Sequence, residues 1–284
     1  MKINLVTVCG HNTTMLRHML NHYKDFIDEI FVVVYLSSDK DRVLSEVKEI
    51  TRDLNIDIHR KTIEEPFNWE RVTELYNETK LLKPDDWWIV ADDDEFHVYP
   101  RPINELIEDC NEKGYKFITG AFLDRIGENG RFPKIQPFDD SDIWEEFPLV
   151  GSFRYPISNA CPNKTVVMKG NIQVTNGQHY AMIDGEDTYG DRWMNDLRYP
   201  VGDCFIQVHH FKWDYSVLER LKQVSKSKLV ESFSEEYRKM LSAIEHFNYR
   251  IDLSEREYMF QRVDIPRYNL YSYWPRLRKK ITEV

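Results

Sequence analysis

Short apolar runs alternate with amphipathic stretches along the first hundred residues. The runs have the length and β-branched content of buried strands and lie at 3–8, 30–35, 56–59 and 87–90. The segments between them repeat apolar residues at helical spacing, at 15–27, 43–54 and 69–82. A strand–helix–strand order requires parallel strands with right-handed helical crossovers. We therefore expect an α/β fold with a mostly parallel central sheet, flanking helices, and ligands bound beyond the carboxyl ends of the strands.

Four consecutive acidic residues, Asp92 to Glu95, come directly after the apolar run at 87–90 and the small residue Ala91. Clustered carboxylates repel one another, and their burial is costly unless a cation neutralises them. Hard oxygen ligands suit Mg²⁺ or Mn²⁺, which normally also hold phosphate oxygens of a substrate. The pattern predicts a divalent-cation site, with a solvated acidic turn as the alternative.

Other phosphate-binding or metal-binding motifs do not account for these acids. An EF-hand that started at Asp92 would need Gly at its sixth position and Glu at its twelfth, where His97 and Ile103 stand. The sequence also lacks a P-loop, a Gly-x-Gly-x-x-Gly dinucleotide turn and a His-Glu-x-x-His helix.

The second half of the chain follows a different pattern. A short helix at 103–110, ended by Gly114, precedes a fifth apolar run at 115–123. The stretch 124–208 is rich in Pro, Gly, Asp and aromatic residues and shows only short strand signals, at 165–168, 172–175 and 205–208. Two amphipathic helices follow, one over 217–224 and one expected to begin at the capping residue Ser234.

Three of these features together resemble the metal-dependent glycosyltransferases of the GT-A fold, in the broad family-2-like group. They are the N-terminal α/β half, the apolar strand that ends in Asp92-x-Asp94-Glu95-Phe96, and the segment Val208-His209-His210-Phe211-Lys212-Trp213. The resemblance covers about residues 1–230. It implies a GT-A domain over 1–214, with a nucleotide-binding half (1–100) and an acceptor half (101–214), and a C-terminal helical extension over 215–284 packed on it.

The same resemblance assigns roles in holding a cation, Mn²⁺ or Mg²⁺, on the diphosphate of a nucleotide sugar. Asp94 is the direct ligand, Asp92 reaches the cation or the ribose, and Asp93 borders the donor. His210 is the second ligand. His209 is its substitute, because adjacent residues of a strand point to opposite faces and only one of them can face the cation.

The carboxyl ends of the first two strands are expected to border the nucleotide. Thr7, Val8 and Gly10 lie in the first of these segments, where a small residue permits close approach of the backbone. Related enzymes often place acids at the end of the second strand to read the base, but Tyr35 stands there. Tyr35 either stacks on a base or caps the sheet. The identity of the base therefore stays open.

Further basic residues are candidates on the donor side. Arg71 and Lys80, on the third predicted helix, have the charge to face a diphosphate, the alternative being an ordinary surface position. His179 follows a strand signal and either lines the site or is a hydrogen-bonded structural residue.

Sugar transfer with inversion needs a carboxylate that takes the proton of the acceptor hydroxyl. Asp124 follows the fifth apolar run directly, near the expected cation end of the sheet. Asp187, in the pair Glu186-Asp187, is the other candidate catalytic base. We favour Asp124, because acids in a Gly-containing loop such as the one around Asp187 are often turn residues.

Charge and cysteine usage limit the partners and the compartment. The net charge of −10 disfavours nucleic-acid binding, and four cysteines without close spacing fit free thiols and a cytoplasmic setting. No apolar run approaches the roughly 20 residues that span a bilayer. The aromatic and basic segment 267–280 suggests peripheral contact with an anionic membrane, or a tail packed on its own domain. The oligomeric state is left open.

The leading function is transfer of a sugar from a nucleotide-sugar donor to a hydroxyl of a glycan or glycoconjugate acceptor. A metal-dependent phosphohydrolase or nucleotidyltransferase would use the same acids, although Glu95 stands where a haloacid-dehalogenase-type phosphatase has Thr or Val. A non-catalytic carbohydrate-binding module with a calcium site is the third alternative. The donor, the acceptor and the stereochemistry are not encoded in any pattern we recognise.

Overall fold

The computed structural model describes residues 2–39, 41–65, 67–151, 153, 157–158, 161, 163–188, 196–200, 206–226, 231–253 and 261–262. In this part the helices are α1 (Leu16–Tyr23), α2 (Arg42–Asp53), α3 (Trp69–Lys80), α4 (Ile103–Lys113), α5 (Ile143–Glu146), α6 (Val217–Ser225) and α7 (Glu231–His246). The strands of the large sheet are β1 (Ile3–Cys9), β2 (Glu29–Leu36), β3 (Ile58–Ile63), β4 (Trp87–Val90), β5 (Glu95–Val98), β6 (Phe117–Ile126), β7 (Leu149–Gly151), β8 (Asn163–Lys169), β12 (Ile206–His210) and β13 (Gln261–Arg262). A small antiparallel sheet contains β9 (Gln173–Val174), β10 (Ala181–Ile183) and β11 (Glu186–Asp187).

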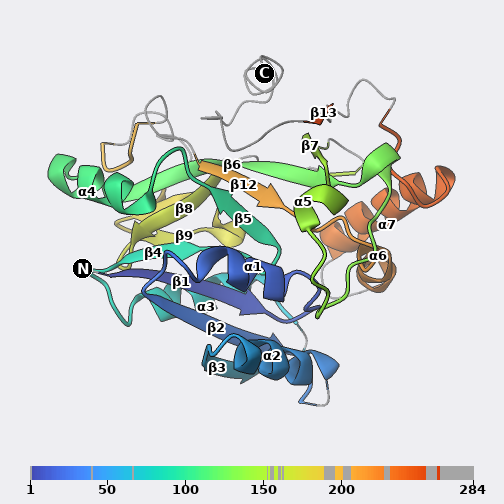
Figure 1. Ribbon diagram of the computed structural model, residues 1–284, viewed down its shortest axis with the longest axis horizontal. Helices are drawn as coiled ribbons and strands as arrows, with labels where there is room; N and C mark the ends of the chain where they lie inside the picture. Colours follow the sequence, from blue (N-terminus) through green and yellow to red (C-terminus); the bar gives the residue numbers. More distant parts are fainter. Residues whose placement is uncertain are drawn as a thin grey trace.

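The large sheet confirms the expected α/β class (Figure 1). Its N-terminal half has the order β4-β1-β2-β3 with every neighbouring pair parallel, as the helical crossovers require. The other half is mixed, because β8 runs antiparallel to both β4 and β6. The carboxyl ends of β1, β2 and β4 therefore meet at one edge of the sheet.

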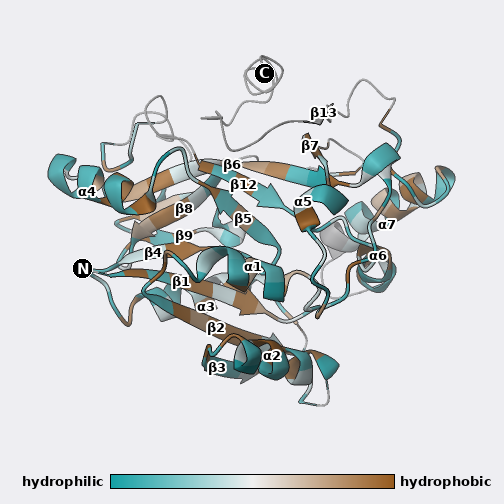
Figure 2. Cartoon of the chain, viewed as in Figure 1, coloured by the Kyte–Doolittle hydropathy of each residue, from teal (hydrophilic) through white to brown (hydrophobic). Residues whose placement is uncertain are grey.

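Alternating side chains of the strands build two cores, one on each face of the sheet. Ile3, Leu5 and Cys9 of β1 pack with α1, α2 and α4, whereas Val6 and Val8 pack with α3 and the small sheet. Figure 2 shows the result as hydrophobic strands covered by helices that are hydrophilic on their outer sides. Burial on both faces explains why the parallel strands read as continuous apolar runs.

Strand β12 connects distant parts of the chain. It pairs antiparallel with β5, with His210 opposite Glu95, and parallel with β6, with His210 opposite Asp124. The backbone N–H of Phe211 donates to the carbonyl of Asp94 at 2.9 Å. The acidic turn, the second half of β6 and the histidine pair are thereby brought together.

The C-terminal helices pack on the rest of the chain through a third apolar cluster. Leu221 of α6 and Met240 and Ile244 of α7 are buried with Phe132 and Trp213. Helices α6 and α7 therefore contact residues that precede them in the chain, and the expected division into a domain and an extension stays a prediction. The segment 267–280 lies outside the described residues.

Several element boundaries differ from the sequence-based expectations. The strand expected at 56–59 is β3, which starts later and runs to Ile63. The fifth expected strand is β6, which continues to Ile126, so Asp124 lies within this strand and not after it. Helix α7 begins at Glu231, three residues before the predicted cap at Ser234. The left-handed Gly114 ends α4 as predicted, with φ of 80°.

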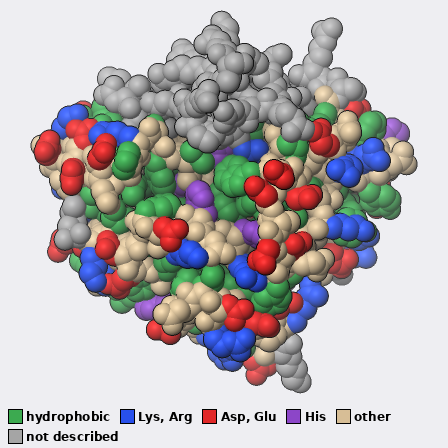
Figure 3. All heavy atoms as spheres, viewed as in Figure 1, with side chains coloured by type: hydrophobic (Ala, Val, Ile, Leu, Met, Phe, Trp, Pro, Cys, Tyr) green, Lys and Arg blue, Asp and Glu red, His purple; other side chains and the backbone are tan. Residues whose placement is uncertain are grey.

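No helix in the described part of the chain is both long and apolar enough to cross a membrane. Within the described residues, Cys9, Cys110 and Cys161 take part in no disulfide bond. Acidic and basic side chains are interspersed over the described part of the face in Figure 3.

Candidate functional site

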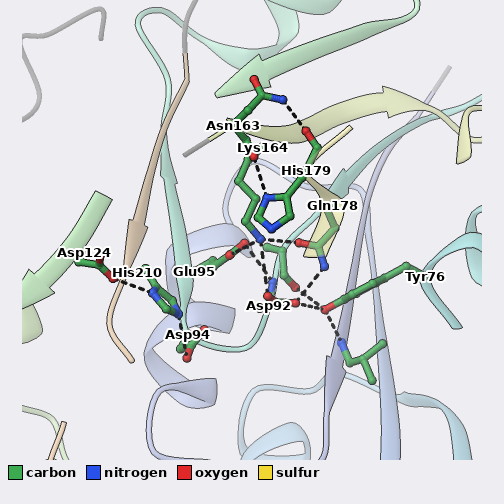
Figure 4. A network of polar contacts seen from close by, with 12 residues as sticks. Tyr76, Asp92, Asp94, Glu95, Asp124, Asn163, Lys164, Gln178, His179 and His210 are labelled. Atoms are coloured by element: carbon green, nitrogen blue, oxygen red, sulfur yellow. Dashed lines mark hydrogen bonds and ion pairs between the residues drawn. The ribbon is translucent and has the colours of Figure 1, made fainter. Parts of the chain in front are cut away.

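The acidic residues form the turn between β4 and β5. The backbone N–H of Glu95 donates to the carbonyl of Asp92 at 3.0 Å, which closes the turn. Because β4 is a central strand and β5 is paired with β12, the turn is held from both sides. Its four carboxylates then point to different surroundings, which Figure 4 shows for Asp92, Asp94 and Glu95.

Asp92 points to the inner side of the turn. The hydroxyl of Tyr76 donates to Asp92 Oδ1 at 2.7 Å, and Gln178 Nε2 donates to the same oxygen at 3.1 Å. Lys164 Nζ lies 3.7 Å from the other oxygen, Oδ2. Oδ1 of Asp92 is therefore fully used by protein groups, whereas Oδ2, on a side chain that is 34% exposed, has only the ion pair with Lys164.

Glu95 lies on the same inner side and is almost completely buried. Its Oε1 lies 2.6 Å from Nζ of Lys164, and the two side chains are 1% and 3% exposed. Burial raises the pKa of Glu95 to about 7, although the charge of Lys164 opposes this shift. Lys164 also donates to Gln178 Oε1 at 2.7 Å.

Asp94 points to the outer side, toward His210. The Nε2 atom of His210 lies 3.5 Å from Asp94 Oδ2, and its Nδ1 atom lies 3.1 Å from Asp124 Oδ1 (Figure 4). Burial opposes both charges, yet the attraction between them lowers the pKa of Asp94 to about 2 and, together with Asp124, raises the pKa of His210 to about 9.

Asp124 has both carboxylate oxygens engaged. Besides His210, Trp213 Nε1 donates to Oδ1 at 2.8 Å, and the backbone N–H of Phe153 lies 3.4 Å from Oδ2. The side chain is 5% exposed. A carboxylate that fixes one ring nitrogen of a histidine, while the other faces a cation position, is the usual partner of metal-binding histidines.

Asp93 faces the first strand. Its carboxylate lies next to the buried thiol of Cys9, which donates to the carbonyl of Asn12 at 3.3 Å. Burial, strengthened by the charge of Asp94, raises the pKa of Asp93 to about 8. Asp93 therefore differs from Asp94 in having no basic partner at salt-bridge distance among the described residues.

A small cavity adjoins Asp94 on this outer side. Its lining includes the acid Asp214 and the two basic residues Lys212 and Arg220. Asp214 is 3% exposed, and its Oδ2 atom has no partner with hydrogen-bond geometry among the described residues. Burial, to which the charge of Asp94 adds, raises the pKa of Asp214 to about 6. Both acidic and basic groups therefore line the cavity.

These groups fit a divalent cation that a substrate helps to hold. The 3.5 Å separation of Asp94 Oδ2 and His210 Nε2 is long for a hydrogen bond and suits two ligands of one ion. Within the described residues no three acidic, histidine or cysteine side chains are already arranged as a complete metal site. Mg²⁺ and Mn²⁺ sites commonly use few carboxylates plus phosphate oxygens, so an incomplete protein ligand set is compatible with them.

The residues expected to border the nucleotide lie at the predicted edge of the sheet, but most are buried. Tyr35 is completely buried, its hydroxyl accepts from the backbone of Asn68 at 3.0 Å, and its ring centroid lies 4.6 Å from that of Phe67. This geometry favours the sheet-capping role of Tyr35 over base stacking. A Cβ atom on Gly10 would meet the carbonyl oxygen of Tyr35 at 2.1 Å. Internal packing is therefore sufficient reason for glycine there.

Thr7 and Val8 are also buried within β1. The side chain of Thr7 is fully covered, and the backbone N–H of Val8 points toward the hydroxyl of Tyr76 at 3.4 Å. Neither side chain faces the cavity beside Asp94. Their proposed contact with the donor stays a prediction.

The basic candidates on α3 have other partners. Arg71 forms ion pairs with three carboxylates, those of Glu64, Glu74 and Glu78, at 2.6–3.1 Å. Lys80 is completely buried and contacts the carbonyl of Ile172 and the sulfur of Met168. Neither group is directed at the acidic turn in this structure, which argues against a role in diphosphate binding.

The two histidines of β12 point to opposite faces, as the alternation of a strand requires. His209 is completely buried; its Nδ1 accepts from Arg125 at 3.2 Å, and its Nε2 lies 3.1 Å from Gln207. His210 faces Asp94. The structure therefore places His210, and not His209, at the candidate site.

The remaining candidates lie on or near the small sheet. Asp187 is exposed on β11, a strand of two residues. His179 follows the 3-10 helix Asn176–Gln178, and its Nδ1 lies 2.9 Å from the carbonyl of Asn163. Burial lowers the pKa of His179 to about 4. This histidine is a hydrogen-bonded neighbour of the inner side of the turn.

The structure also adds residues that the sequence did not single out. Lys164, Gln178 and Tyr76 hold the inner side of the turn, and Asp214 and Arg220 line the cavity. They come from separate segments and match no local motif. Only the short strand signal at 165–168 hinted that the region around Lys164 is buried.

Comparisons with known proteins give distant structural likeness. Neither a family model nor a curated protein matches the sequence. Solved structures similar to this chain include S. aureus TarS (TM-score 0.33, 13% identity, 88% of this chain and 44% of that chain) and its 1–349 form in complex with UDP-GlcNAc (TM-score 0.36, 12% identity, 88% and 74%). A putative glucose-1-phosphate thymidylyltransferase from Bacillus anthracis is also similar (TM-score 0.32, 8% identity, 99% and 96%). The chain spans less than half of the full TarS structure, and TM-scores this low assign no function.

Proposed function

We propose that the chain is a Mn²⁺- or Mg²⁺-dependent glycosyltransferase that moves a sugar from a nucleotide-sugar donor to a hydroxyl of a glycan or glycoconjugate acceptor. One observation carries the proposal. Asp94, at the end of a parallel strand, and His210, from a strand 116 positions later, face each other at 3.5 Å. The resemblance of both segments to GT-A enzymes agrees with this pairing.

The residues around Asp94 would have separate roles in binding the cation and the diphosphate. Asp94 and His210 hold the cation, and Asp124 fixes the ring of His210 through Nδ1. The cation, when bound, supplies a Lewis acid for the leaving diphosphate. Arg220 and Lys212, on the cavity wall, offset the remaining diphosphate charge.

The acceptor hydroxyl also has to lose a proton. Asp187 and Asp124 are the two candidates for this base. Asp187 is exposed on β11, whereas Asp124 is buried and engaged by both His210 and Trp213. The geometry therefore shifts our preference to Asp187, and Asp124 fits better as an orienting group.

Thermal-shift measurements with nucleotide diphosphates and nucleotide sugars, with and without Mn²⁺, test the proposal. We expect one nucleotide to raise the melting temperature only when Mn²⁺ is present. Asp94→Ala should abolish this stabilisation, because it removes the direct carboxylate ligand. Asp93→Ala is the matched control and should have a milder effect, since Asp93 faces Cys9.

Other outcomes would point to other functions. Stabilisation by Ca²⁺ and free sugars without any nucleotide would favour a carbohydrate-binding module. Release of inorganic phosphate, or formation of a nucleotide sugar from a sugar phosphate, would favour a phosphohydrolase or a nucleotidyltransferase. Stabilisation by no nucleotide under any condition would contradict the glycosyltransferase proposal.

A further inference from the structure

Lys164 is a buried ammonium group that lies beside acceptors from two other segments of the chain, the acidic turn and the segment of Gln178. Nζ lies 2.6 Å from Glu95 Oε1, 2.7 Å from Gln178 Oε1 and 3.7 Å from Asp92 Oδ2. An ammonium group has three hydrogens to donate. The contact with Gln178 is a hydrogen bond, those with Glu95 and Asp92 are ion pairs, and only 3% of Lys164 is exposed, so its charge is directed at the turn and not at solvent.

The same contacts divide the acidic turn into two sides. Asp92 and Glu95 lie on the inner side with Lys164, and Asp94 lies on the outer side with His210 (Figure 4). The ring of Phe122 contacts both basic residues: its centroid is 5.5 Å from Nζ of Lys164 and 4.3 Å from the centroid of His210. An aromatic ring thus lies against the positive groups of both sides.

The charges explain why such a division is useful. Four adjacent carboxylates without an internal cation would compete for the same bound ion and would repel one another. A lysine fixed at 2.6 Å from Glu95 removes that carboxylate from the competition, since leaving either charge of the pair buried alone is strongly unfavourable. The same ammonium group lies 3.7 Å from Asp92 Oδ2 and offsets its charge as well.

We propose that Lys164 is a positioning residue: it is the fixed counter-ion of Asp92 and Glu95, and it leaves Asp94 to bind the cation. The inference rests on the proposed function and deepens it, because it assigns the inner carboxylates to the protein and not to the metal. It also differs from the expectation that Asp92 reaches the cation.

A double-mutant cycle on the full chain tests this assignment. Lys164→Met and Glu95→Gln each remove one charge of the pair, the double variant removes both, and Lys164→Arg keeps the charge. Lys169→Met, on the same strand but with its ammonium donating to the carbonyl of Asp85 at 2.8 Å, is the matched control. Two quantities are measured for each folded variant: Mn²⁺ affinity by calorimetry and stability by urea unfolding.

We expect Lys164→Met to weaken Mn²⁺ binding by about tenfold or more, as loss of groups that orient a metal site usually does. Adding Glu95→Gln should recover most of that loss, because no buried charge is then left unpaired. Lys164→Arg and Lys169→Met should stay close to the wild type. A lysine with a purely structural role would lower the stability of Lys164→Met without changing the Mn²⁺ affinity of its folded fraction.

Three results would overturn the inference. The first is Mn²⁺ affinity unchanged in folded Lys164→Met. The second is a double variant as weak as Lys164→Met, which would mean that Lys164 acts on the ligand directly. A wild-type chain that binds no Mn²⁺ would instead contradict the proposed function. In that case the urea-unfolding cycle alone tests the pairing of Lys164 with Glu95. The third overturning result is that the two substitutions change the free energy of unfolding additively.

Discussion

Replacing Asp124 by Asn separates two roles that one carboxylate cannot both fill in this structure. As a catalytic base, Asp124 must take a proton from the acceptor. As an orienting group, it must hold Nδ1 of His210, which lies 3.1 Å from Oδ1. Asn is nearly isosteric and keeps one oxygen that can accept from His210 and from Trp213, so the fold should survive.

The two roles predict losses of different size and kind. Loss of a carboxylate that orients a metal-binding histidine typically weakens metal affinity by about 10–100-fold, so we expect Mn²⁺ to bind about tenfold more weakly to Asp124→Asn. Loss of a general base would instead lower transfer by about 10²–10⁴-fold with unchanged Mn²⁺ affinity.

The assay compares Mn²⁺ affinity by calorimetry with the transfer rate at saturating Mn²⁺, for Asp124→Asn, Asp187→Asn and His210→Ala. We expect excess Mn²⁺ to restore most of the transfer rate in Asp124→Asn and part of it in His210→Ala. Asp187→Asn should bind Mn²⁺ normally and transfer poorly. If Asp124→Asn binds Mn²⁺ like the wild type but does not transfer, Asp124 is the base and the orienting role is wrong.

Three further predictions concern residues around the site. Burial lowers the pKa of Lys80 from 10.5 to about 7. Between these two pH values the unfolded chain binds a proton that the folded chain does not. The free energy of unfolding should therefore rise with pH from about 7 to about 10, by up to ~1.4 kcal/mol per pH unit. Lys80→Met should remove this rise in urea unfolding, and Lys83→Met, which loses a partly exposed ion pair, should keep it. Arg220→Ala should weaken binding of the preferred nucleotide diphosphate about tenfold, whereas Arg71→Ala should leave it unchanged in the same calorimetric titration. His209→Ala should lower stability by about 1–3 kcal/mol without lowering Mn²⁺ affinity, and a fall in that affinity would show that the wrong histidine faces the ion.

The sequence predicted the N-terminal half of the fold, in which apolar strands alternate with amphipathic helices. The strand at 87–90 matches β4 at both ends, because a buried parallel strand is a continuous apolar run bounded by polar residues. The sequence patterns predicted no strand at the positions of β5 and β7. Both strands are short and are stabilised by pairing with strands that are distant in the sequence. Such strands have no periodicity of their own to read.

The candidate site was predictable to a similar extent. Asp94 follows the apolar strand β4 and His210 ends the apolar strand β12, so the sequence indicated that both lie near strand ends. Their meeting depends on the antiparallel pairing of β12 with β5. Lys164 could not be found this way. Its side chain reaches the turn from β8, a strand that runs antiparallel to β4, and nothing in the sequence shows that β8 lies beside it.

The register of β12 is what converts an acidic turn into a candidate cation site. This strand is paired on both edges, and each histidine has its own set of partners: Arg125 and Gln207 for His209, two carboxylates for His210. A slip of one residue would turn His210 away from Asp94 and Asp124 to the opposite face of the sheet. It would also move His209 away from Arg125. Both edges would have to break their hydrogen bonds for that slip to occur. The sheet itself therefore fixes which ring meets the acids, and Asp94 lies beside His210 only because β12 pairs with a strand more than a hundred residues away in the sequence.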